Sequence, residues 1–136
     1  MNKKIMIPAL LAALIGGSTA FTEHADARSK DKKWELAKPT GEPVNCINLS
    51  QIRNTRVRSD KIIDFYISNR KIMRNELPYS CPSLGFEERF LYKTSLSQLC
   101  SVDMITVLHN NGGYNGGLGL GASCGLGKFQ PMEIPK

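Results

Sequence analysis

The chain has 136 residues and a formal net charge of +6 at pH 7, with 22% charged and 41% hydrophobic residues. This length holds one domain at most, which excludes a multidomain architecture. A hydrophobic core of this size is only marginally stable by itself, so covalent cross-links are important for the fold.

Residues 1–27 have the pattern of a secretory signal peptide. A short basic start precedes an apolar run at 5–15, which is too short to span a bilayer. Ala25-Asp26-Ala27 fits the small-x-small cleavage rule, and we expect cleavage after Ala27 or, alternatively, after Ala20. We therefore expect a periplasmic or secreted bacterial protein with no transmembrane segment after cleavage; an uncleaved membrane anchor is the alternative.

Residues 28–44 are polar and charged, and they contain Pro39, Gly41 and Pro43. This composition predicts a flexible polar leader. Trp34 is the exception, and we favour an aromatic packed loosely against the domain over a contact with a partner. The folded domain is then expected to cover 45–136.

Three strands are predicted between Ile52 and Leu77, at 53–58, 63–68 and 71–75. In the middle strand, apolar residues alternate with Asp64, Tyr66 and Ser68, which is the period of a half-buried strand with one mostly polar face. Turn-forming residues separate the strands, and Pro78 ends the third. The pattern predicts a three-stranded antiparallel meander.

The rest of the chain contains fewer regular elements. We expect a fourth strand at 89–93, one capped helical turn at 94–98, and a well-buried fifth strand at 102–108. A glycine-rich loop at 110–121 precedes a last short strand near 128–130. The fold class is therefore mainly β: a small antiparallel twisted sheet or partly closed barrel of five to six strands.

The four cysteines all follow the predicted signal peptide, as in the disulfide framework of a small exported protein. If the strands alternate up and down, Cys46 and Cys100 fall at one end of the sheet, and Cys81 and Cys124 at the other. We prefer these two pairs among the three connectivities that the sequence permits. No Cys-x-x-Cys pair is present, so neither a metal site nor thiol redox chemistry is expected.

Basic residues crowd the meander, and they give the main functional signal. The predicted binding residues are Arg53, Arg56, Arg58, Arg70 and Arg74. They form either a solvated face that protects sheet edges or a patch for an anionic envelope component or an acidic protein. Nucleic acid is not expected, because few aromatic residues accompany the charges and the location is extracytoplasmic. No feature of the sequence specifies an oligomeric state.

Catalytic motifs are weak. His109 is the one histidine after residue 27, with serines at 95, 97, 101 and 123 and Asp103 as candidate partners, but no Gly-x-Ser-x-Gly elbow occurs. Glu87 and Glu88 are adjacent, so on a strand they would point to opposite faces. The glycine-rich loop lacks the Gly-Lys-Ser/Thr of a phosphate-binding loop. We therefore expect no catalytic residue, no cofactor and no metal.

Six segments resemble a family of small exported proteins of proteobacteria, a domain of unknown function. They lie at 46–47, 52–57, 74–78, 81–84, 95–103 and 124–129. The resemblance covers roughly 45–132. It implies export and a fixed four-cysteine frame, and it implies no activity.

The sequence favours an exported, non-enzymatic binding or envelope-associated domain that uses its basic sheet face for an anionic partner. The alternatives are a small secreted hydrolase, an enzyme inhibitor or a structural envelope component.

Overall fold

The structure is a computed structural model that describes residues 32–110 and 119–136. The predicted signal peptide and most of the glycine-rich loop lie outside these residues. In chain order the elements are η1 (Lys33–Leu36), β1 (Lys38–Pro39), β2 (Cys46–Asn48), η2 (Leu49–Gln51), β3 (Asn54–Val57), β4 (Ile62–Tyr66), β5 (Lys71–Glu76), α2 (Leu84–Glu87), β6 (Phe90–Tyr92), β7 (Gln98–Cys100), β8 (Met104–His109), β9 (Gly119–Gly125) and β10 (Phe129–Glu133).

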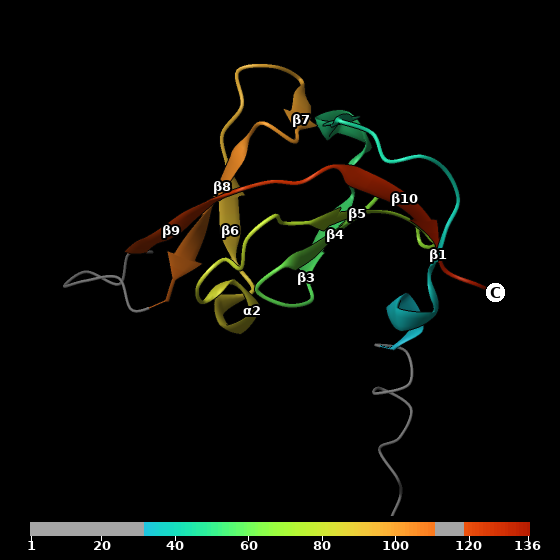
Figure 1. Ribbon diagram of the computed structural model, residues 1–136, viewed down its shortest axis with the longest axis horizontal. Coiled ribbons are helices and arrows are strands. Elements are labelled where there is room, and N and C mark those ends of the chain that lie inside the picture. Colours follow the sequence, from blue (N-terminus) through green and yellow to red (C-terminus); the bar gives the residue numbers. More distant parts are fainter. Residues whose placement is uncertain (1–31, 111–118) are drawn as a thin grey trace, which may run out of the picture.

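The described strands form three open antiparallel sheets, which confirms the mainly β fold class (Figure 1). The largest has the order β1-β10-β5-β4-β3, so the last strand of the chain lies inside the sheet, between β1 and β5. A second sheet has the order β6-β8-β9, and β2 pairs with β7 in a two-stranded ribbon. Within the described residues, no helix has the length and apolar character that a membrane crossing requires.

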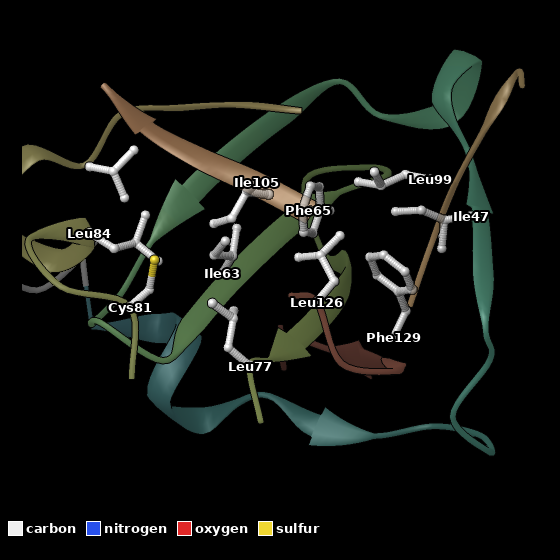
Figure 2. Packing of buried hydrophobic residues seen from close by; sticks show 11 residues of the cluster. Ile47, Ile63, Phe65, Leu77, Cys81, Leu84, Leu99, Ile105, Leu126 and Phe129 are labelled. Carbon is white, nitrogen blue, oxygen red and sulfur yellow. The ribbon is translucent and has the colours of Figure 1, made fainter. Parts of the chain in front are cut away.

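The meander is confirmed by β3, β4 and β5, which pair as successive antiparallel neighbours. Ile63 and Phe65 of β4 are completely buried on the inner face of the sheet. Phe65 makes edge-to-face contacts with Phe129 of β10 and Phe90 of β6, whose ring centroids are 5.6 and 6.2 Å away. These contacts place the main core between the two larger sheets (Figure 2).

Part of the opposite face of the large sheet, over β5 and β10, is also covered, which differs from the half-exposed meander that the sequence suggested. Ala37 follows η1 and packs with Ile72, Met132 and Ile134 in a second, smaller cluster. β1 pairs with β10, and the amide of Thr40 donates a hydrogen bond to the carbonyl of Pro131. Residues 32–44 of the predicted leader thus pack on the outer face through η1 and Ala37 and pair along the edge of the sheet beside β10, and we call them the N-terminal strap.

Several other predicted elements differ in detail. The strand predicted at 102–108 corresponds to β8, in which Ile105 and Val107 are buried. Val102 lies before the start of this strand and is 87% exposed. Residues 95–97 form a bend instead of a helical turn, and Gln98 is already the first residue of β7. β9 begins at Gly119, within the predicted loop, and pairs with β8. The fourth strand and the last short strand correspond to β6 and β10.

The disulfides are Cys46–Cys100 and Cys81–Cys124, as preferred from the sequence. Cys46 and Cys100 are directly opposite each other in the β2–β7 ribbon, with Cα atoms 4.0 Å apart. The single up-and-down sheet assumed in the prediction is not what brings them together, since the ribbon is separate from the large sheet. Two disulfides in a small domain indicate a non-cytoplasmic location.

Candidate anion-binding site

The outer face of the meander contains a buried ion cluster. Asp64 on β4 is directly opposite Arg74 on β5, and its carboxylate accepts hydrogen bonds from Nε (2.7 Å) and Nη2 (3.0 Å) of that arginine. Arg58, just after β3, donates from Nε to the same carboxylate (3.0 Å). The side chain of Asp64 is 0% exposed, and those of Arg58 and Arg74 are 13% and 17% exposed. The two arginines therefore supply the counter-charges and hydrogen bonds that a fully buried carboxylate requires.

Trp34 covers this cluster from the N-terminal strap. Its ring centroid lies 4.5 Å from Cζ of Arg58 and 5.3 Å from Cζ of Arg74, as in cation–π contacts. Its carbonyl also accepts a hydrogen bond from Nη2 of Arg74 (3.2 Å). Trp34 is thus part of the packing around the ion cluster, which is a closer association than the loose contact favoured from the sequence.

Arg70 is also engaged within the protein. It forms an ion pair with Glu133 and donates from Nε to the carbonyl of Ile134 (3.2 Å). Three of the five predicted binding residues therefore have internal partners. Among the described residues, Arg53 and Arg56 have no acidic group within 4 Å.

Arg53, Arg56 and Arg58 nevertheless line one hollow, which we call the arginine hollow. Its volume is about 400 Å³. The other lining residues are neutral and polar: Asn54, Tyr66, Ser68 and Asn69. Arg74 and Arg70, in contrast, do not line it. No carboxylate lines the hollow, so its electrostatic potential favours an anion.

The geometry of β3 and β4 explains this grouping. Alternate residues of a strand point to the same face, which places Asn54, Arg56 and Arg58 together on the outer side. Asn54 is opposite Tyr66 in the register, and the β4–β5 turn adds Ser68 and Asn69 beside them. The hollow therefore lies along the whole of the edge strand β3.

Arg58 is held rigidly at the wall of the hollow. Its Nε binds Asp64, its Nη2 donates to the hydroxyl of Tyr66 (2.7 Å), and its guanidinium plane lies over Trp34. Its Nη1 has no acceptor within the parts of the chain that the structure describes. A guanidinium whose orientation is already fixed loses little side-chain entropy when it binds a ligand. Arg58 can therefore act as a preorganised donor beside the exposed Arg53 and Arg56.

The candidate catalytic residues are arranged differently from the sequence-based pairing. Nδ1 of His109 lies 2.9 Å from Oε1 of Glu87, and the amide of Asn110 donates to Oε2 of the same carboxylate (3.3 Å). The hydrogen bond from His109 is the main cause of a lowered pKa of Glu87. Asp103 instead accepts a hydrogen bond from the amide of Cys100 (2.7 Å).

Ser123 does not serve His109 as a nucleophile in this structure, since its hydroxyl lies 2.8 Å from that of Thr106. No serine or threonine hydroxyl in the described residues is hydrogen-bonded to His109. The Glu87–His109 contact therefore orients a histidine without supplying the nucleophile that an acyl-transfer site requires.

A second opening of about 430 Å³ lies between the β2 segment and the large sheet. Its lining mixes apolar residues, such as Val44, Ile67 and Met73, with polar residues such as Asn48 and Gln98. It has no group of convergent charges like that of the arginine hollow. Within residues 32–110 and 119–136, no cluster of three or more His, Cys, Asp or Glu could hold a metal ion.

Sequence reasoning placed Tyr66 on the basic face but missed the other neutral residues of the arginine hollow, which are Asn54, Ser68 and Asn69. Asn54 could have been found, because it shares the strand face of Arg56 and Arg58 at a spacing of two. Ser68 and Asn69 were interpreted only as turn residues. Comparisons of the whole chain with protein-family models, with curated proteins and with solved structures found no match.

Proposed function

We propose that this is an exported, non-enzymatic binding protein that captures an anionic group of its partner in the arginine hollow. The single observation that carries the proposal is a concave site lined by three arginines and by neutral polar side chains, with no carboxylate on its surface. The signal-peptide pattern of residues 1–27, the two disulfides and the resemblance to a family of small exported proteins support a periplasmic or secreted location.

The chemistry of the lining favours an oxyanion. Guanidinium groups present paired N–H donors that match carboxylate, phosphate and sulfate oxygens. Amide and hydroxyl groups of Asn54, Ser68 and Asn69 surround them and can accept or donate hydrogen bonds. Such a site offers one donor that is already in place, Arg58, beside two exposed arginines, Arg53 and Arg56.

The proposal is tested with a double variant, Arg53→Gln with Arg56→Gln. Both residues are exposed and have no acidic partner in the described residues, so the melting temperature should stay unchanged. Binding of inorganic tripolyphosphate, measured by titration calorimetry at low salt, should weaken by about tenfold or more, because two charge-assisted contacts are lost. Affinity should also fall as salt is raised, since exposed charges are screened.

The matched control is Lys93→Gln with Lys128→Gln. This double variant removes the same amount of charge from exposed positions that do not line the arginine hollow. Equal weakening in the control would mean that only net charge matters. Undiminished binding by the Arg53 and Arg56 variant would remove the basis of the proposal. Reversal of Arg58 or Arg74 is a poor test, because each holds the buried Asp64.

A further inference from the structure

A second basic hollow adjoins the arginine hollow. It has a volume of about 290 Å³, and its cationic lining residues are Lys33, Arg70 and Lys136. Tyr66 and Asn69 line both hollows, so the two adjoin at this pair of side chains. We call the new site the lysine hollow and the shared pair the Tyr66–Asn69 ridge.

Each hollow has two cations that form no ion pair in the part of the chain that the structure describes. In the lysine hollow Arg70 is paired with Glu133, but Lys33 and Lys136 have no acidic side chain within 4 Å among the described residues. In the arginine hollow, Arg53 and Arg56 likewise have no acidic side chain within 4 Å among the described residues. No acidic side chain lines either hollow. The surface therefore offers two positive sites in succession, and it is complementary to a chain with several negative groups.

The neutral groups between the charges are suited to a ligand that carries many hydroxyl groups. The ridge presents an aromatic side chain and an amide, and Asn54 and Ser68 lie beside it in the arginine hollow. An aromatic side chain combines an apolar surface with a polar tip, and amides and hydroxyls pair with ligand hydroxyls. This alternation of cationic and neutral polar positions matches a polymer whose anionic groups are spaced by uncharged sugar carbons and hydroxyls.

Two other polyanions fit less well. A planar membrane surface cannot enter two concave sites, and the large exposed hydrophobic residues Tyr79, Phe86 and Val102 line neither hollow. Single-stranded nucleic acid needs aromatic faces for its bases, but Trp34 already stacks on Arg58 and lies near Arg74. Trp34 also lines the lysine hollow, but its ring already contacts these two arginines, so Tyr66 is the one aromatic side chain of the two hollows without a cation–π partner among the described residues.

We infer that the partner is a linear acidic polysaccharide that spans both hollows across the Tyr66–Asn69 ridge. This inference rests on the proposed function and specifies its ligand. Because two sites then bind one chain, an oligosaccharide long enough to reach both should bind much more tightly than a short one. A fragment that occupies one hollow should not show this gain.

The experiment measures the dissociation constants of heparin fragments of two, six and ten sugars, used as a linear acidic glycan probe. For the unaltered protein, the ten-sugar fragment should bind about 100-fold more tightly than the two-sugar fragment. Both Arg53→Gln with Arg56→Gln and Lys33→Gln with Lys136→Gln should reduce this ratio by about tenfold. The control Lys93→Gln with Lys128→Gln should keep the ratio.

The outcomes separate this inference from the proposed function. If only the Arg53 and Arg56 variant weakens binding, the anion site stands and the spanning ligand is wrong. If neither hollow variant changes binding, both are wrong. Equal affinity for single-stranded DNA of the same charge, or binding to vesicles of anionic phospholipid in preference to the glycan, would overturn the polysaccharide assignment while leaving the basic hollow as an anion site.

Discussion

Replacement of Asp64 by asparagine should strongly destabilise the protein. The carboxylate is completely buried and accepts three guanidinium hydrogen bonds, two from Arg74 and one from Arg58. Asparagine has nearly the same shape, but it leaves two buried cations without a counter-charge and turns an amide NH₂ toward one of them. Breaking a buried ion pair from one side costs about 3–5 kcal/mol. Because the remaining amide oxygen can still accept one hydrogen bond, we expect a value near the lower end, about 3 kcal/mol.

This loss is a large part of the total stability of a small domain, which is about 5–15 kcal/mol. At about 4–8 °C per kcal/mol for a domain of this size, the melting temperature should fall by about 12 °C or more. Urea unfolding of the oxidised protein gives the free energy directly. Trp34 is the one tryptophan of the chain, so its fluorescence reports on the cluster while circular dichroism reports on the sheets.

The matched control is Glu76→Gln, which removes an exposed carboxylate from the neighbouring strand β5. It should change the free energy of unfolding by less than about 0.5 kcal/mol. The triple replacement Arg58→Met, Asp64→Leu and Arg74→Leu should recover most of the stability, because an apolar cluster of similar volume avoids the desolvation of charges. If Asp64→Asn proved as mild as the control, the cluster would not be the buried ion network described above.

Three further measurements test other parts of the structure. Replacing both cysteines of either disulfide by alanine should lower the free energy of unfolding by about 4 kcal/mol, because the closed loops span 54 and 43 residues; a loss below about 1 kcal/mol in urea titrations would contradict this chain-entropy argument. Gly127→Ala should prevent normal packing, because a Cβ atom there would clash with the carbonyl oxygen of Glu76. Its melting temperature should fall much further than that of Gly125→Ala, where a Cβ atom would meet nothing. The pKa of Glu87 should lie below the ordinary value of about 4.3, and His109→Phe should raise it in an NMR titration. Because the folded-state pKa is lowered, the stabilisation by Glu87 should be complete above the unfolded-state pKa and should be lost as the pH falls through the folded-state pKa. If the titration midpoint of Glu87 were unchanged in His109→Phe, the contact with His109 would not be the cause of the lowered pKa.

The meander was predictable from the sequence because its signals are local. The alternation around Ile63 and Phe65 identifies the core face, and turn residues set the ends of each strand. The cysteine pairs were also predicted correctly. The prediction assumed that Cys46 and Cys100 lie at one end of a single sheet, whereas they are directly opposite each other in the separate β2–β7 ribbon. β9 was missed because its glycine, alanine and serine residues are weak strand formers, and it is held in place by pairing with β8.

The roles of the arginines could not be read from charge alone. Whether Arg58 and Arg74 face solvent depends on Trp34, which lies 24 and 40 residues away in sequence and covers them through the N-terminal strap. Part of the cluster was accessible in principle, because a hairpin between β4 and β5 places Asp64 opposite Arg74. Burial of that pair is a tertiary effect, and the local period gives no information about it.

The position of β10 between β1 and β5 has a consequence for biogenesis. Synthesis from the N-terminus makes β10 last, so until then β5 is an unprotected sheet border and β1 has no strand to pair with. Vectorial delivery can therefore assemble the meander early, but it cannot seal the outer face before the whole chain has emerged. During that interval the partly folded chain presents the free border of β5, and an unpaired border of this kind is a site at which chains associate with one another.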